Sequence, residues 1–187
     1  MTEERDQRRP TREELEAARS KTVRDVIAPG LDILFVGINP GLYTAAIGRH
    51  FGRPGNRFWP SLYRSGLIPE PFTAYDSHRL LESKLGITNL VSRTTAAEAE
   101  LKQPEYAEGT VRLRRKLLRY KPRIAAFLGL GLYRRAFGAP KARVGLQREK
   151  IGSTLLWVFP NPSGLNAHFQ VKDYARLFRE MKRFLDR

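Results

Sequence analysis

Apolar residues occur along the chain in two arrangements, as uninterrupted runs and at helical spacing. Residues 33–36 read Ile-Leu-Phe-Val, and a run without polar alternation is typical of a strand buried on both faces of a parallel sheet. Similar runs predict three more strands, over residues 85–91, 123–128 and 154–159. Apolar residues three and four positions apart predict helices over residues 58–65, 76–84, 104–120, 131–137 and 171–186. Strands alternating with helices indicate an α/β fold, a three-layer α/β/α domain around a central, mainly parallel four-stranded sheet.

The first 28 residues are charged and hold few large apolar side chains. Thr11 and Glu14 have the spacing of a capping box, which predicts a helix from Arg12 to Val26. Residues 1–10 would precede it as a disordered basic arm. We therefore expect a basic N-terminal arm and helix over residues 1–28, and a single α/β/α domain over residues 29–187.

Two of the predicted strands end in turns that place an asparagine beside a proline. Residues 33–36 are followed by Gly37-Ile38-Asn39-Pro40-Gly41, and residues 154–159 by Pro160-Asn161-Pro162. Proline cannot donate to a strand ladder, so each strand must end there. Open α/β sheets bind ligands at the carboxyl ends of their strands, which would bring both asparagines and residues 92–95 to one crevice. Asn-Pro and Pro-Gly are also ordinary turn signals, and Asn39 is alternatively a turn residue only.

The loop over residues 41–57 combines three arginines with an aromatic residue. Arg49, Arg53 and Arg57 suit phosphate contacts, and Phe51 suits stacking on a base. Phe51 is alternatively a loop anchor buried in the core.

The loops that follow two other strands add further candidates. Arg93 and His168 are candidate phosphate contacts. Leu165 stands between Gly164 and Asn166 in a loop otherwise suited to exposure. It is either an ordinary anchoring leucine or a side chain that wedges into a base stack.

The charge of the chain favours a nucleic-acid partner. It holds 34 Lys and Arg against 19 Asp and Glu, a formal net charge of +15, and arginine dominates the excess. The planar guanidinium suits phosphate recognition, although a generally basic surface is the alternative. No apolar run approaches the ~20 residues of a membrane helix, and the charged N-terminus lacks a signal-peptide core. We expect a cytoplasmic monomer that binds no membrane.

The residue types present offer little for a metal or a cofactor. The chain has no cysteine, which excludes disulfides, thiolate zinc sites and cysteine-ligated clusters, and its three histidines are far apart in sequence. Gly129-Leu130-Gly131 follows a predicted strand, but Arg134 stands where a dinucleotide fingerprint needs its third glycine. We expect neither a metal nor a cofactor.

Four motifs together resemble the mismatch-specific uracil-DNA glycosylases, which include thymine-DNA glycosylase. They are Gly37-Ile38-Asn39-Pro40-Gly41-Leu42, Gly55-Asn56-Arg57-Phe58-Trp59, Thr88-Asn89-Leu90-Val91 and Asn161-Pro162-Ser163-Gly164-Leu165. Their order and spacing are similar to the family's over residues 24–186. The resemblance implies an enzyme that flips uracil, with thymine and etheno-cytosine as further candidate bases, out of G·U-type mismatches in double-stranded DNA. It would leave an abasic site for base excision repair.

The same resemblance implies a role for each matching residue. Asn39 would position the attacking water, and Leu165 would fill the hole left in the duplex. The backbone at Gly164 and Asn166 would face the widowed guanine. Ala167-His168 stand where some members carry an arginine after the wedge. The base pocket would be lined by Ile38, Thr44, Phe51 and Asn161.

Neither turn motif contains the pair of carboxylates that ordinary glycoside hydrolases use. Asp32 lies five residues before Gly37, roughly 17 Å from the turn along an extended strand. Asn39 can orient water but cannot usefully accept a proton, so we expect a slow enzyme; lacking a general base forfeits about 10²–10⁴-fold in rate. Glu98 or Glu100 would be the carboxylates to assist. The alternatives are a non-catalytic DNA- or RNA-binding α/β domain and a hydrolase of free nucleosides, which the positive charge disfavours.

Overall fold

Five strands form one sheet in the order β2-β1-β3-β5-β4 in the computed structural model, which describes residues 8–187. The predicted arm over residues 1–10 lies mostly outside the described residues. β1 pairs in parallel with β2 and β3, and β3 with β5, whereas β4 runs antiparallel to β5. The strands are β1 (Ile33–Gly37), β2 (Leu85–Asn89), β3 (Ile124–Leu128), β4 (Gly145–Ile151) and β5 (Thr154–Phe159). A mainly parallel sheet is confirmed, and the prediction of four strands was wrong by one.

The strand that the pattern missed is β4, which forms an edge of the sheet. Its sequence is Gly-Leu-Gln-Arg-Glu-Lys-Ile, and only Ile151 among these residues is buried. An edge strand has one neighbour and needs no apolar run. Charged side chains at such an edge also discourage pairing with other chains.

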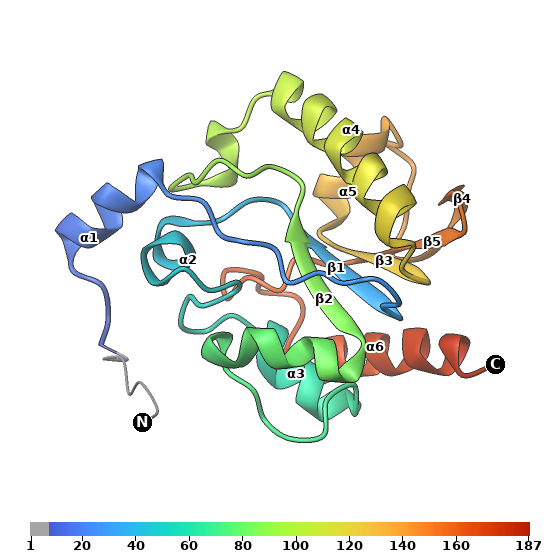
Figure 1. Cartoon of the computed structure of the whole chain (residues 1–187). Coiled ribbons are helices and arrows are strands. Elements are labelled where there is room, and N and C mark those ends of the chain that lie inside the picture. Colours follow the sequence, from blue (N-terminus) through green and yellow to red (C-terminus); the bar gives the residue numbers. More distant parts are fainter. Residues whose placement is uncertain (1–7) are drawn as a thin grey trace.

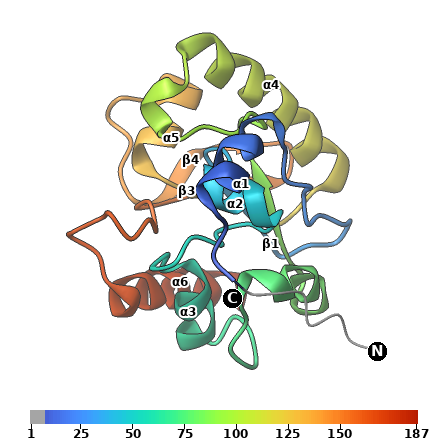
Figure 2. The same ribbon diagram turned by 90° about the vertical axis from the view of Figure 1, so that its left-hand side faces the viewer.

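Helices cover both faces of the sheet (Figures 1 and 2). Ile33 and Phe35 of β1 pack toward α3 and α6, where Phe35 meets Phe58 and Phe178 edge-on. The intervening Leu34 and Val36 belong to a second core cluster, on the side of α4 and α5. The three-layer α/β/α arrangement is therefore confirmed. The helices are α1 (Arg12–Ala17), α2 (Leu42–Ile47), α3 (Phe58–Ser65), α4 (Gln103–Tyr120), α5 (Leu130–Phe137) and α6 (Val171–Leu185), with 3₁₀ segments at Ala18–Ser20, Ala74–Ser83 and Glu98–Glu100.

The segment before β1 differs from its prediction. The capping box at Thr11 and Glu14 is present, but α1 and the 3₁₀ turn after it end at Ser20, so a helix reaching Val26 was wrong. Val26 instead exchanges two backbone hydrogen bonds with Ile87 of β2, at 2.9 and 2.8 Å. Backbone hydrogen bonding to an existing strand outweighs weak helical periodicity here. The segment thus lies beside β2. Its Lys21 and Arg24 carbonyls also accept hydrogen bonds from Thr94 and His50, in loops at the carboxyl ends of the strands.

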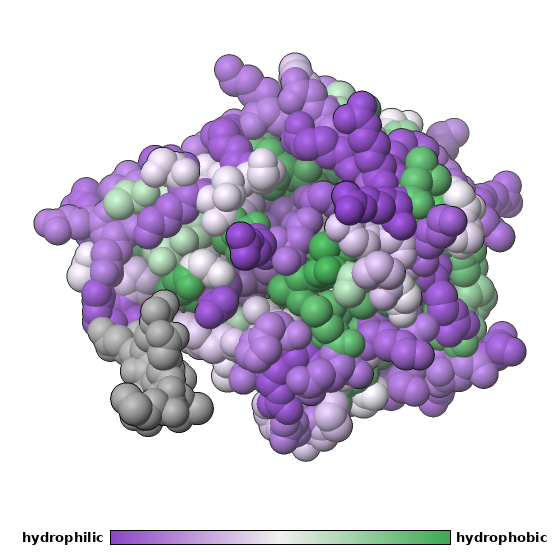
Figure 3. Space-filling model, viewed as in Figure 1, coloured by the Kyte–Doolittle hydropathy of each residue, from purple (hydrophilic) through white to green (hydrophobic). Residues whose placement is uncertain are grey.

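The surface is mostly hydrophilic, with apolar residues gathered in patches near the middle of the face shown in Figure 3. Across residues 8–187, no helix has both the length and the apolar character needed to span a membrane.

Candidate active site at the carboxyl ends of the strands

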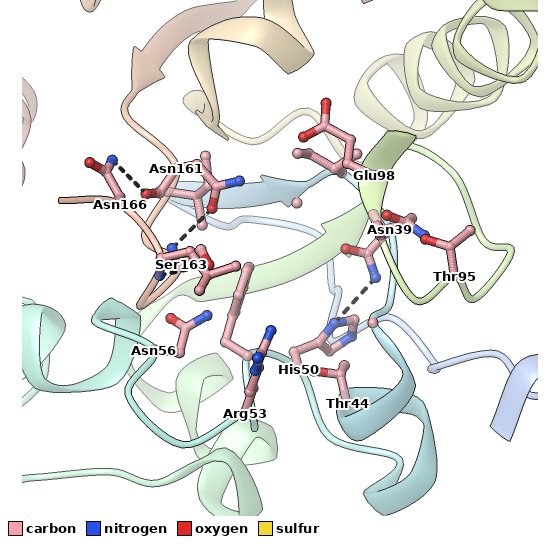
Figure 4. Close-up of a pocket in the computed structure, with 18 of the residues that line it drawn as sticks. Asn39, Thr44, His50, Arg53, Asn56, Thr95, Glu98, Asn161, Ser163 and Asn166 are labelled. Atoms are coloured by element: carbon pink, nitrogen blue, oxygen red, sulfur yellow. Dashed lines mark hydrogen bonds between the residues drawn. The ribbon is translucent and has the colours of Figure 1, made fainter. Parts of the chain in front are cut away.

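A cavity of about 500 Å³ opens where β1, β2, β3 and β5 end. Its walls come from the turn after β1, the loop over residues 48–57, the loop after β2 and the loop after β5. Figure 4 shows Asn39 and Thr95 on one side of it and Asn161 and Asn166 on the opposite side. The lining residues are Gly37, Ile38, Asn39, Gly41, Thr44, His50, Phe51, Arg53, Asn56, Asn89, Thr95, Ala96, Ala97, Glu98, Leu128, Asn161, Ser163, Leu165 and Asn166.

The Asn39 side chain is held by its amide nitrogen. This nitrogen donates to the backbone oxygen of Arg93 and to the hydroxyl of Thr95, both at 2.8 Å, and to the Pro40 carbonyl at 3.2 Å. Because a carbonyl can only accept, the nitrogen must be on this side and Oδ1 on the other. Oδ1 has no partner within residues 8–187, and no unpaired side-chain oxygen there is buried, so Oδ1 is open to solvent. The cavity is therefore lined by a residue whose amide oxygen is fixed in orientation and free of any partner within residues 8–187.

Phe51 packs on the core and also borders the cavity. Its ring packs against Phe58 of the core, with centroids 4.3 Å apart, while the residue also lines the cavity. Its backbone has φ of 53°, a conformation uncommon for a bulky side chain. The glycine at the end of β1 makes room for the ring: a Cβ on Gly37 would lie 3.3 Å from Phe51 Cζ and 2.5 Å from Asn89 Oδ1.

The loop after β5 presents an exposed leucine on a braced turn. Leu165 is 79% exposed and lines the same cavity as Asn39. Asn161 Oδ1 accepts from the backbone N–H of Ser163 at 3.0 Å. The Asn166 amide donates to the Asn161 carbonyl and to the Tyr174 hydroxyl, both at 3.1 Å. The two strand-end turns thus meet across one cavity.

Residues 24–185 match the family model described as the uracil DNA glycosylase superfamily. The chain belongs to this superfamily. The match covers the whole sheet and all four loops of the cavity. The general activity of the chain is accordingly that of a DNA glycosylase, a hydrolase that acts on uracil in DNA.

Asn89 and His50 line this glycosylase site, and neither was assigned a role from the sequence. Asn89 is the last residue of β2, just as Asn39 comes shortly after the end of β1. An asparagine at the end of each strand is visible in the sequence and could have identified Asn89. His50 is 2% exposed, and no periodicity marks a buried polar residue within a loop. Its Nε2 lies 2.9 Å from the Arg24 carbonyl, which makes Nε2 the donor, and its Nδ1 lies 3.5 Å from the Asn89 amide nitrogen. Burial lowers the pKa of His50, so the ring is neutral at pH 7.

The candidate phosphate contacts fall into two groups. The guanidinium groups of Arg49 and Arg53 and the His168 ring are exposed and have no partner within residues 8–187. Arg57 instead donates to the Ser163 and Gly164 carbonyls, at 2.7 and 3.4 Å.

Arg93 forms a two-pronged ion pair with Glu105, at 2.7 and 3.0 Å, and donates to the Glu100 carbonyl at 3.0 Å. The Arg93 hydrogen bond holds the pKa of Glu105 at about 2. Arg93 was expected to contact a phosphate. In the structure its guanidinium is instead paired with Glu105, an acidic residue of α4.

The acidic residues considered in the sequence also differ in whether they line the cavity. Among the described residues that line the cavity, Glu98 is the one acid. Its carboxylate accepts from the Tyr106 hydroxyl at 3.0 Å, lies 3.6 Å from Arg135 and points away from Asn39 (Figure 4). Glu100 accepts from the N–H groups of Ala96 and Ala97 and does not line the cavity. Asp32 precedes β1 and pairs with Arg123, away from the carboxyl ends of the strands.

Proposed function

We propose that this glycosylase is a monofunctional, mismatch-specific enzyme that excises uracil from G·U pairs in double-stranded DNA and leaves an abasic site for base excision repair. One observation carries the proposal: the free amide oxygen of Asn39 and the exposed side chain of Leu165 line the same cavity. The Asn39 oxygen is suited to hold a water molecule against a flipped nucleotide. The Leu165 side chain is suited to occupy the position in the duplex that the flipped nucleotide leaves.

Extrusion of the base comes first. Flipping a nucleotide costs a few kcal/mol, and a mismatched base is less costly to extrude than a Watson–Crick pair. Leu165 would enter the vacated position, and the free guanidinium groups of Arg49 and Arg53 would bind the flanking phosphates. The selectivity for G·U would come partly from the weakness of the mismatch itself.

Hydrolysis then needs a placed water and a stabilised leaving group. A water donating a hydrogen bond to Asn39 Oδ1 would attack C1′ of the deoxyribose as the C1′–N1 bond breaks. The bonding electron pair would leave with N1 of uracil, and the proton of the water would pass to solvent. Phe51 would stack on the base, and the Asn89 and Asn161 amides would hydrogen-bond its polar edge. Glu98 is the one acid among residues 8–187 that lines the cavity, and it points away from Asn39. The rate would therefore depend mainly on the leaving group.

The wall near the base also bears on the range of substrates. Thr44, Ala96 and Ala97 line the cavity with small side chains. This supports thymine and etheno-cytosine opposite guanine as further candidate bases.

A cleavage panel tests the proposal directly. Duplexes with U opposite G or A, T opposite G and etheno-cytosine opposite G, together with single-stranded uracil DNA, would be incubated with the full chain and analysed for abasic product. We expect the fastest cleavage at G·U. Equal rates for U opposite G and A would reject mismatch specificity, and tight binding without any abasic product would leave the non-catalytic nucleic-acid-binding alternative.

A further inference from the structure

Leu165 extends into solvent from a loop that is held on two sides. On one side, the buried hydroxyl of Tyr174 in α6 donates to the Asn161 carbonyl at 2.6 Å and accepts from the Asn166 amide. On the other side lies the loop over residues 52–57. An exposed leucine gains by folding back onto apolar surface, so its position must be maintained by the loop backbone.

The contact with the 52–57 loop centres on Arg57. Its backbone N–H donates to the Pro162 carbonyl at 2.9 Å, and its guanidinium donates to the carbonyls of Ser163 and Gly164. Gly164 also lies directly on the neighbouring loop, because a Cβ there would be 2.9 Å from the Gly55 oxygen. Three successive carbonyls before Leu165 therefore point toward one residue.

Arg53 offers a comparison within the same loop. It lies four residues before Arg57, is exposed and lines the cavity, and its guanidinium has no partner within residues 8–187. Both arginines looked equally suited to phosphate in the sequence. The structure gives them different partners: Arg53 faces solvent, whereas Arg57 is half-buried and its donors are taken by the Leu165 loop.

We infer that Arg57 is a positioning residue that acts through the 162–165 turn, holding Leu165 ready for insertion into the duplex, and that it is not a phosphate contact. The inference rests on the proposed function of Leu165 as the wedge. The planar guanidinium donates to the two carbonyls from two separate nitrogens, a geometry that the single nitrogen of lysine does not match. A loop that is already ordered loses less conformational freedom when the wedge enters DNA.

The test compares Arg57→Lys and Arg57→Gln with Arg53→Lys and Arg53→Gln in the full chain. Single-turnover excision would be measured on a G·U duplex and on single-stranded uracil DNA. We expect Arg57→Lys to slow excision from the duplex about tenfold or more, up to the 10²-fold typical of a misplaced group, with single-strand excision within about twofold of wild type. Equal losses on the two substrates would overturn the inference.

Salt dependence separates positioning from phosphate contact without requiring cleavage. The slope of log Kd against log salt concentration falls by about 0.9 for each lost contact with duplex phosphate. We expect this fall for Arg53→Gln and an unchanged slope for both Arg57 variants. A shallower slope for Arg57→Lys would make it a phosphate contact. A wild type that cleaves no uracil substrate would reject the proposed function, and the slope would still decide the role of Arg57.

A double-mutant cycle covers the case in which Arg57→Gln fails to fold. If Arg57 acts through Leu165, then Arg57→Lys should add less than about twofold to the effect of Leu165→Ala on duplex excision. Independent, multiplicative losses would show that Arg57 acts elsewhere.

Discussion

The amide nitrogen of Asn39 lies 2.8 Å from the hydroxyl oxygen of Thr95, which ties the turn after β1 to the loop after β2. The Thr95 N–H in turn donates to the Pro40 carbonyl at 3.1 Å. The Arg93 carbonyl, 2.8 Å from the same nitrogen, determines which end of the Asn39 amide is free, because a carbonyl can only accept. Without this carbonyl, the side chain could rotate and present its N–H groups to the cavity. These would donate to the oxygen of the water instead of accepting one of its hydrogens.

Asn39→Ala should retain DNA affinity and lose most excision. The substitution removes the free amide oxygen and leaves the arginines and Leu165 in place. Removal of one positioned hydrogen-bonding group typically lowers kcat by about 10²–10³-fold. Single-turnover excision and filter binding on the same G·U duplex measure the two effects. Excision at the wild-type rate would remove Asn39 from the mechanism and direct attention to Glu98.

Leu165→Ala should affect duplex substrates selectively. Burying a leucine side chain contributes about 1.5–3 kcal/mol, so its loss from a DNA duplex corresponds to roughly 10–150-fold in excision. Because Leu165 is 79% exposed, the free energy of unfolding should stay within about 0.5 kcal/mol of wild type. Leu146→Ala is the matched control, since Leu146 is an exposed leucine on β4. Equal loss on duplex and single-stranded uracil DNA would reject the wedge role.

Gly37→Ala should impair function more than stability. The new Cβ would lie 2.5 Å from Asn89 Oδ1, the mobile end of a side chain that lines the cavity, so Asn89 would move. We expect overpacking to lower the free energy of unfolding by about 1–2 kcal/mol in urea denaturation, with excision reduced at least about tenfold by the displaced amide.

Gly41→Ala provides the comparison for Gly37→Ala, because a Cβ on Gly41 meets no atom within 4 Å. Its stability should remain within about 0.5 kcal/mol of wild type. A Gly37→Ala protein that keeps full activity would show that the Asn89 position is not critical.

The sheet and the Asn39 turn could be predicted because a strand buried on both faces leaves an uninterrupted apolar run that ends at proline and glycine. β4 could not, since an edge strand carries no such run. The partner of an arginine is also hidden in sequence. Arg57 and Arg53 look alike there, but residues 162–165, distant along the chain, offer carbonyls to Arg57 and not to Arg53. Periodicity reports which side chains are buried in regular elements, whereas His50 is buried in a loop.

His50→Gln should weaken the dependence of stability on pH. Burial lowers the pKa of His50 most; the nearby Lys116 also lowers it, while the Arg24 carbonyl and Asp25 oppose this. Above the unfolded-state pKa of about 6.5 the ring is neutral in both states. Below pH 6.5 the imidazole of His50 binds a proton in the unfolded chain but stays neutral in the folded protein. The free energy of unfolding of the wild type therefore falls by at most about 1.4 kcal/mol per pH unit until the pH drops below the pKa of the folded state.

Urea denaturation between pH 7.5 and 5 measures this effect. At pH 7.5 the variant should be less stable than wild type, because it loses a fitted ring that is 2% exposed. The difference should narrow below pH 6.5, since the variant has no buried imidazole to keep neutral. His168→Gln, in an exposed loop, should follow the wild-type curve. Parallel curves for wild type and His50→Gln would mean that the buried ring does not govern acid stability.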